Sequence, residues 1–166
     1  LCNLEIPTVF GLAAETVLSA AEKCHPDVIL CVGLAAGRDA VTPERIAVNI
    51  RDARIPDNAG SQPQGAYVVP DGPAAYFSTL PVRDMIAAMK EAGVPASLSN
   101  TAGTFVCNDL MYGLLDHLAR TGQTIPAGFI HIPATPAQAC DRPTPSMAPG
   151  TVAKGLEAAL KTLIMK

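Results

Sequence analysis

The sequence predicts an α/β fold in which helices cover both faces of a mainly parallel, twisted central sheet, giving three layers, α/β/α. Short apolar runs alternate along the chain with segments of helical periodicity, which is the pattern of parallel strands joined by helices. The composition is 49% hydrophobic but only 4% aromatic, which suits helices packed on an apolar sheet. The 166 residues are of one-domain size and contain no linker or repeat, so we expect a single domain over 1–166.

The first half of the chain contains two expected strands and one expected helix. Residues 1–7 (LCNLEIP) are a candidate strand, and 12–24 form an Ala-rich helix. The uninterrupted apolar run at 28–33 (VILCVG) is typical of a central parallel strand. Residues 45–56 alternate apolar and polar side chains, as a half-buried extended segment does. The Pro-, Gly- and Asn-rich residues 56–81 predict a long irregular loop with one short hairpin.

The second half alternates in the same way. We expect a helix at 82–92, a strand at 96–101, a helix at 108–119, a strand at 127–133, a Pro-rich loop at 134–150 and a final helix at 151–165. Asn108 or Asp109 is placed to cap the helix at 108–119. Cys107 therefore falls where a loop or strand meets a helix N-terminus.

Charge and cysteine content exclude several classes of function. The net charge is −3, from 15 acidic and 12 basic residues without a Lys/Arg cluster, so nucleic acid is not an expected partner. The longest apolar run, 28–36, is far shorter than the roughly 20 residues that span a bilayer. No signal peptide is recognisable. Five irregularly spaced cysteines without a CxxC pair fit reduced thiols in a cytoplasmic protein and argue against a metal site.

Cys107 is the cysteine whose surroundings best predict reactivity. The partial positive charge and free N–H groups of a helix N-terminus favour a thiolate over a thiol. The alternative is an inert buried cysteine, the default for a single Cys in an apolar run, and the local sequence alone prefers it. The segment 33–39 (GLAAGRD) has the small residues of a phosphate loop but lacks nucleotide-binding motifs.

A nucleophilic thiol needs a histidine base and a group that orients this base. His131 is near the carboxyl end of a predicted strand, where sites form in α/β sheets, so it and Cys107 can meet at one edge. His131 is otherwise a packed core histidine, and we interpret His117 as a surface residue of its helix. Glu44 and Asp57 are the candidate orienting acids, although Glu44 also fits the first turn of a helix begun by Thr42 and Pro43. The pattern alone does not separate these alternatives.

Three long segments resemble one known family. Residues 41–63, 99–118 and 128–138 closely resemble, in order, the pyroglutamyl peptidase I family, also called pyrrolidone-carboxylate peptidases. The resemblance implies a cysteine peptidase that removes an N-terminal pyroglutamyl residue from peptides, in an α/β/α fold without metal or organic cofactor. It also implies a homo-oligomer, a tetramer in many bacterial members, and we expect 72–77 (GPAAYF) to contribute to the contact.

The resemblance also implies roles for individual residues. The family's nucleophile falls on Cys107, its histidine on His131 and its glutamate on Glu44. Arg54 falls on an arginine that lies near the nucleophile and assists the oxyanion. The remaining matched positions are the apolar lining of the substrate slot and an aspartate that is an alternative partner of the histidine: Ile55, Phe105, Val106 and Asp57.

The chain departs from the family pattern at several positions. Leu34 and Ala36 replace a glutamine and a glycine in the usual GQAGGR, and the chain starts after the family's first strand and its Gly/Phe-rich loop. These departures favour a second hypothesis, a catalytically inactive homologue that serves as a binding or assembly protein. The intact Glu44, Cys107 and His131 argue against it. A third hypothesis, a cysteine hydrolase of another small amide, shares the machinery and differs in the pocket.

Overall fold

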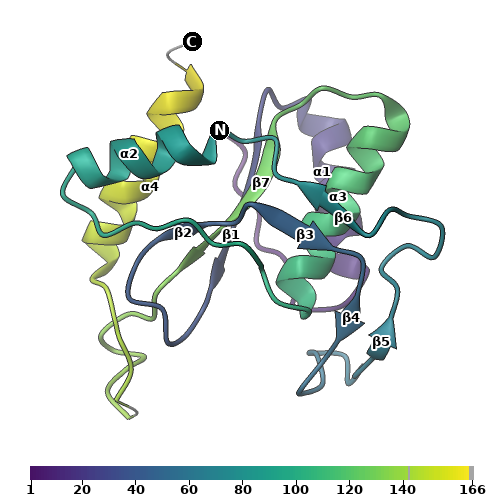
Figure 1. Ribbon diagram of the computed structural model, residues 1–166, viewed down its shortest axis with the longest axis horizontal. Coiled ribbons are helices and arrows are strands. Elements are labelled where there is room, and N and C mark those ends of the chain that lie inside the picture. Colours follow the sequence, from purple (N-terminus) through teal and green to yellow (C-terminus); the bar gives the residue numbers. More distant parts are fainter. Residues whose placement is uncertain (142, 165–166) are drawn as a thin grey trace.

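The computed structural model describes residues 1–141 and 143–164 and has the predicted three-layer α/β architecture (Figure 1). Its central sheet has the order β1-β7-β2, with β1 at Ile29–Leu34, β7 at Ala127–Ile132 and β2 at Thr42–Pro43. β1 runs parallel to β7, whereas β2 is antiparallel to it, so the sheet is mixed. The strands predicted at 28–33 and 127–133 are confirmed.

Two pairs of helices cover the two faces of this sheet (Figure 1). On one side lie α1 (Leu12–Cys24) and α3 (Val106–Thr121), and on the other α2 (Val82–Glu91) and α4 (Pro149–Ile164). These bounds confirm the helices predicted at 12–24, 82–92 and 151–165, although residue 165 is outside the described part of the chain. No helix in the described part is long and apolar enough to cross a membrane.

Neighbouring residues of β7 face opposite layers. Phe129 is buried in the core between the sheet and the α1/α3 layer, and Ile130 in the core on the α2/α4 side. Side chains alternate along a strand, so His131 faces the α1/α3 layer together with Phe129. This alternation decides which helix meets the histidine.

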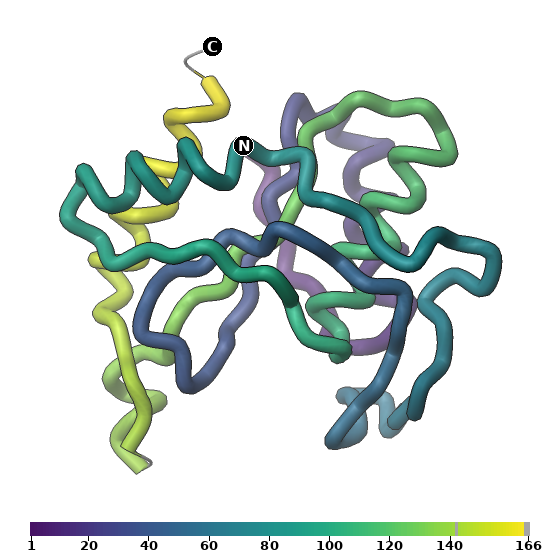
Figure 2. The backbone as a smooth tube through the Cα atoms, viewed as in Figure 1, coloured from purple at the N-terminus to yellow at the C-terminus, as the bar shows by residue number. Residues whose placement is uncertain are grey.

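The long segment at 56–81 makes no hairpin of its own. Its two short strands, β5 (Gln64–Ala66) and β6 (Ala75–Phe77), pair antiparallel with β4 (Arg51–Asp52) and β3 (Ile46–Val48), respectively. Figure 2 follows the chain through this excursion between β4 and β6. The predicted hairpin is therefore wrong, because each strand finds its partner in the preceding extended segment.

Two predicted strands are absent or incomplete. Residues 1–7 form no strand, since Leu1 and Leu4 remain exposed and no neighbouring segment pairs with them. Residues 96–101 run beside β2, where Ser97 N–H donates to the Val41 carbonyl and Ser99 N–H to that of Pro43, but they form only isolated bridges. An apolar run becomes a strand only where a partner supplies a continuous ladder.

The helix α3 begins two residues before the predicted start, with Phe105 as its N-cap residue. Asn108 and Asp109 lie inside the first turn, are buried and do not cap it. The Asn108 side chain bonds both the N–H and the carbonyl of Val48, while Asp109 accepts from Gly11 N–H at 2.7 Å. The two polar side chains thus tie the start of α3 to other segments, and Cys107 lies within the first turn.

Candidate active site

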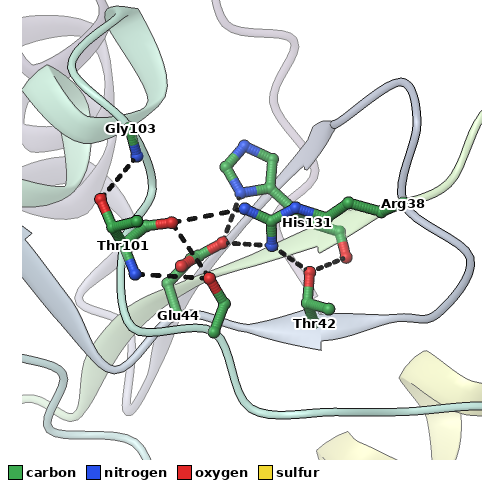
Figure 3. A network of polar contacts seen from close by, with 7 residues as sticks. Arg38, Thr42, Glu44, Thr101, Gly103 and His131 are labelled. Carbon is green, nitrogen blue, oxygen red and sulfur yellow. Dashed lines mark hydrogen bonds and ion pairs between the residues drawn. The ribbon is translucent and has the colours of Figure 1, made fainter.

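A buried acid and a histidine meet at the end of β7. Glu44 follows β2, is 0% exposed, and its backbone N–H donates to the Phe129 carbonyl. Its Oε1 lies 2.7 Å from Nδ1 of His131, which is 4% exposed (Figure 3). The alternative of a helix begun by Thr42 and Pro43 is wrong, because these residues form β2. The sheet holds both partners, so the pair is rigidly placed.

Cys107 lies against the same end of the sheet. A Cβ placed on Gly33 would be 3.3 Å from Cys107 Sγ, so the thiol packs directly on this glycine. Gly33 is the register partner of His131 across β1 and β7. Since His131 faces the α1/α3 layer and Cys107 belongs to α3, the thiol and the imidazole lie on the same side of the sheet, and Gly33 links them as the contact of one and the register partner of the other.

Gly33 is a site residue that the sequence interpretation missed. The same Cβ would come within 2.7 Å of the Phe129 ring, whose centroid lies 4.7 Å from that of His131. Only glycine leaves room for both the ring and the thiol. Its sequence signal was a glycine near the end of an apolar strand, which indicates close approach of another group.

The surroundings of Cys107 keep its thiol protonated. Burial raises the pKa of this thiol to about 11, and the negative charge of Glu44 adds to the effect. The charge of Arg38 and the Cys107 backbone N–H act in the opposite direction. Burial outweighs these two opposing effects, so the thiol is not a thiolate by itself. A thiolate at neutral pH requires a group that takes the proton and offsets the new charge.

Arg38 is the second site residue that the sequence interpretation missed. Its Nη1 donates to Glu44 Oε1 at 2.7 Å and also contacts the Thr42 hydroxyl, and its Nη2 donates to the Thr101 carbonyl at 3.3 Å (Figure 3). The segment 33–39 was considered only as a phosphate loop. The available signal was a buried acid, which requires a cation, and an arginine that follows the end of a neighbouring strand.

The other matched residues differ in exposure. Arg54 and Ile55 are exposed in the loop after β4, and the Arg54 side chain has no hydrogen bond or ion pair to a described residue. Phe105 is partly buried and packs edge-to-face on Phe10 at 5.3 Å between centroids. Val106 is 4% exposed and belongs to the core, so it does not line an open slot in this structure.

The Asp57 carboxylate bonds to backbone groups and not to His131. Its carboxylate accepts hydrogen bonds from the backbone N–H groups of Phe10, Ala59 and Ser61. These bonds, led by that from Phe10, hold the pKa of Asp57 below its usual range. In this geometry Asp57 organises its own loop, while the carboxylate on His131 is that of Glu44.

The two substituted positions of the GQAGGR pattern lie at the surface. Leu34 is the last residue of β1 and is 47% exposed, and Ala36 lies exposed in the turn that follows. Within residues 1–141 and 143–164, no three His, Cys, Asp or Glu side chains are grouped so that they could hold a metal ion.

Comparisons with known proteins match the chain over nearly its whole length. A family model described as "Pyroglutamyl peptidase" matches residues 1–166. The chain is 53% identical over 158 residues to the pyrrolidone-carboxylate peptidase of Bacillus subtilis, covering 95% of this chain and 74% of that protein. It is 54% identical over 156 residues to the Streptomyces coelicolor enzyme of the same name, covering 94% and 72%.

Solved structures give the same result. The crystal structure of pyroglutamyl peptidase I from Bacillus amyloliquefaciens superimposes with a TM-score of 0.93 at 46% identity, covering 95% of this chain and 75% of that one. A mutant pyrrolidone carboxyl peptidase from P. furiosus gives a TM-score of 0.93 at 40% identity, with 97% and 80% covered. The α/β architecture is thus shared with enzymes of known fold.

Proposed function

The chain belongs to the pyroglutamyl peptidase family, and we propose that it hydrolyses the N-terminal pyroglutamyl residue of peptides through Cys107, His131 and Glu44. The observation that carries the proposal is the buried Glu44–His131 pair, 2.7 Å between Oε1 and Nδ1, on the face of β7 that meets Cys107. The relatives described above bear the names of peptidases, so we do not favour the inactive homologue.

The first step is proton transfer from Cys107 to His131. Glu44 accepts from Nδ1, which leaves Nε2 of His131 as the site that receives the thiol proton. The thiol pKa of about 11 means that Cys107 is not a thiolate by itself. The imidazolium formed on His131 offsets the new negative charge, and Glu44 stabilises that imidazolium.

The thiolate then attacks the pyroglutamyl carbonyl carbon. The tetrahedral intermediate collapses as His131 donates its proton to the departing peptide amine, leaving a thioacyl group on Cys107. His131 next takes a proton from water, whose oxygen attacks the thioacyl carbonyl, and returns this proton to the Cys107 sulfur. Free pyroglutamate leaves, and no cofactor is consumed.

Two donors are proposed for the oxyanion. The Cys107 backbone N–H lies at the start of α3, where it has no carbonyl partner within the helix. The Arg54 guanidinium is exposed and unpaired among the described residues, so it is available to a bound substrate. Loss of one oxyanion donor typically costs roughly 100-fold or more in kcat.

Substrate selection rests on apolar walls. Pyroglutamate is a small neutral lactam without a free α-amine, so its pocket needs apolar contacts and a few hydrogen bonds rather than an acid. Phe105 and Ile55 carry accessible apolar surface. Val106 lies in the core next to Phe105 and is proposed to support this wall from beneath.

Cys107→Ser tests the assignment. We expect the variant to release no fluorophore from a pyroglutamyl arylamide, with an unchanged circular dichroism spectrum. The control is Cys140→Ser in an exposed loop, which should retain activity. Turnover by Cys107→Ser would refute the assignment, and faster turnover of a prolyl than of a pyroglutamyl conjugate would indicate a hydrolase of another small amide.

We further propose that residues 1–166 act as a single domain of a cytoplasmic homo-oligomer, with a tetramer as the expected form. The exposed apolar rings of Phe77 (66%) and Tyr67 (65%) on the β5–β6 excursion support a contact there. Phe77→Ser is expected to lower the mass measured by light scattering, whereas Leu12→Ser, at an exposed position of α1, should not. An unchanged mass in Phe77→Ser would place the contact elsewhere.

A further inference from the structure

Glu44 carries a charge in a place where a charge is costly. Its carboxylate is fully buried, and a neutral His131 offers it a hydrogen bond but no countercharge. The cation that touches it is Arg38, with Nη1 at 2.7 Å from Oε1. We propose that Arg38 is a positioning residue for the proposed peptidase reaction, which pairs with the buried Glu44 carboxylate and holds it turned toward His131. This inference rests on the proposed function.

The contacts of Arg38 suit that role. Both Arg38 and His131 bind the same oxygen, Oε1, whereas Oε2 of Glu44 is buried without a hydrogen-bond partner in the described residues (Figure 3). Two donors on one oxygen define the rotation of the carboxylate. Without Arg38, the carboxylate can turn and present its other oxygen to His131.

Arg38 also connects Glu44 to the loop that precedes the nucleophile. Its Nη2 donates to the Thr101 carbonyl, in the loop that leads into α3 and Cys107. Arg38, in the turn after β1, therefore links this turn to Glu44 after β2 and to the loop before α3. A planar fork of donors makes such a multiple contact, and a lysine ammonium does not reproduce it.

The charges around the site act on the thiol as well. Among the described residues, Glu44 and Cys107 interact with three other ionisable groups: Arg38 after β1, Cys31 on β1 and His131 on β7. Glu44 raises the pKa of the Cys107 thiol and Arg38 lowers it. Removal of Arg38 would leave the thiol beside an uncompensated carboxylate, which disfavours the thiolate.

Arg38→Gln tests the inference, because it removes the charge and keeps a side chain that can donate a hydrogen bond. Loss of Arg38 removes a positive charge that lowers the pKa of the Cys107 thiol, so the acidic limb of the kcat/KM profile should move to higher pH. We expect kcat at pH 7 to fall by up to about 100-fold, because a small misplacement of the groups that hold the reacting residues costs about this much in rate. KM should stay unchanged, since Arg38 is not proposed to touch substrate.

Arg38→Lys is the conservative variant. It keeps the charge and loses the fork, so the pH profile should return toward that of the wild type while kcat recovers only in part. This rescue also keeps the inference testable if Arg38→Gln fails to fold.

Arg51→Gln is the matched control. Arg51 and Arg38 have the same side-chain exposure, 26%, and each pairs with a carboxylate that is at most 1% exposed, Asp109 for Arg51 and Glu44 for Arg38. The control should lower thermal stability without moving the pH profile. Wild-type kinetics in Arg38→Gln would refute the inference, and so would lost activity with an unmoved pH profile that Arg38→Lys does not restore.

A second readout does not depend on turnover. The pH dependence of Cys107 alkylation by iodoacetamide, followed by peptide mass mapping, should shift to higher pH in Arg38→Gln and not in Arg51→Gln. A wild-type chain without peptidase activity would refute the proposed function, whereas an unshifted alkylation profile would refute the role of Arg38.

Discussion

Replacement of Gly33 by alanine tests whether the close packing of β1, Phe129 and Cys107 holds the site. The added Cβ would lie 2.7 Å from Phe129 Cζ and 3.3 Å from Cys107 Sγ. Ordinary carbon–carbon contact begins at about 3.5 Å, so the Phe129 ring must move by about 0.8 Å. Overpacking of this kind costs about 1–3 kcal/mol in the free energy of unfolding. For a chain of this length, that lowers the Tm by about 2–12 °C.

The kinetic consequence should exceed the loss of stability. The Phe129 ring packs against His131 at 4.7 Å between centroids, so a displaced ring displaces the imidazole. A misplacement of about 1 Å costs up to about 100-fold in rate. Thermal unfolding and turnover of a pyroglutamyl arylamide measure the two effects.

The control is a glycine-to-alanine substitution at a position where the added Cβ has room. A Cβ on Gly150, near the start of α4, meets nothing within 4 Å, so Gly150→Ala should leave activity unchanged and the Tm equal or higher. Wild-type stability and activity in Gly33→Ala would refute the argument, because the ring and thiol would then not constrain this position.

Three further predictions concern the acids and the thiol. Glu44→Gln should lower kcat far more than Asp57→Asn, since only Glu44 bonds His131; the reverse ranking in kcat/KM would move the orienting role to Asp57. Asp57→Asn should instead remove stability: the folded pKa of Asp57 is lowered, so its contribution is present above the unfolded pKa of about 3.9 and is lost as pH falls through the folded value. Chemical denaturation from pH 7 to pH 3 measures the free energy of unfolding of the wild type and of Asp57→Asn. A difference between the two that stays constant across that range would contradict the prediction. In His131→Ala, alkylation of Cys107 should rise only toward pH 11, whereas reaction near neutral pH, followed by mass mapping, would show that the thiolate forms without His131.

The helices were predictable because their signals are local. The helix at 12–24 has its predicted bounds, and the apolar runs around Ile29 and Phe129 form the central parallel pair. Residues 1–7 are as apolar as a strand but find no partner, and Asn108 and Asp109, which look like caps, bond to distant segments instead. In each of these wrong predictions, the presence or absence of a contact with a segment remote in sequence outweighed the local preference.

The same distinction between local and distant contacts applies to the candidate site. The residues that carry the proposed reaction, Cys107, His131 and Glu44, were recognisable from motifs in the sequence, because their types and neighbours are characteristic of a family. Glu44 and His131 are 87 positions apart, and only folding brings Oε1 and Nδ1 within 2.7 Å.

The sequence by itself determined the layers, the helices and the residues proposed as nucleophile, base and acid, since hydrophobic periodicity and motifs are properties of neighbouring residues. The tertiary structure alone decided that Arg38 pairs with Glu44, that Gly33 must leave room for Phe129 and Cys107, and that burial holds the thiol protonated. Burial, countercharge and close packing are relations between segments remote in sequence, and they exist only once the sheet and α3 have come together.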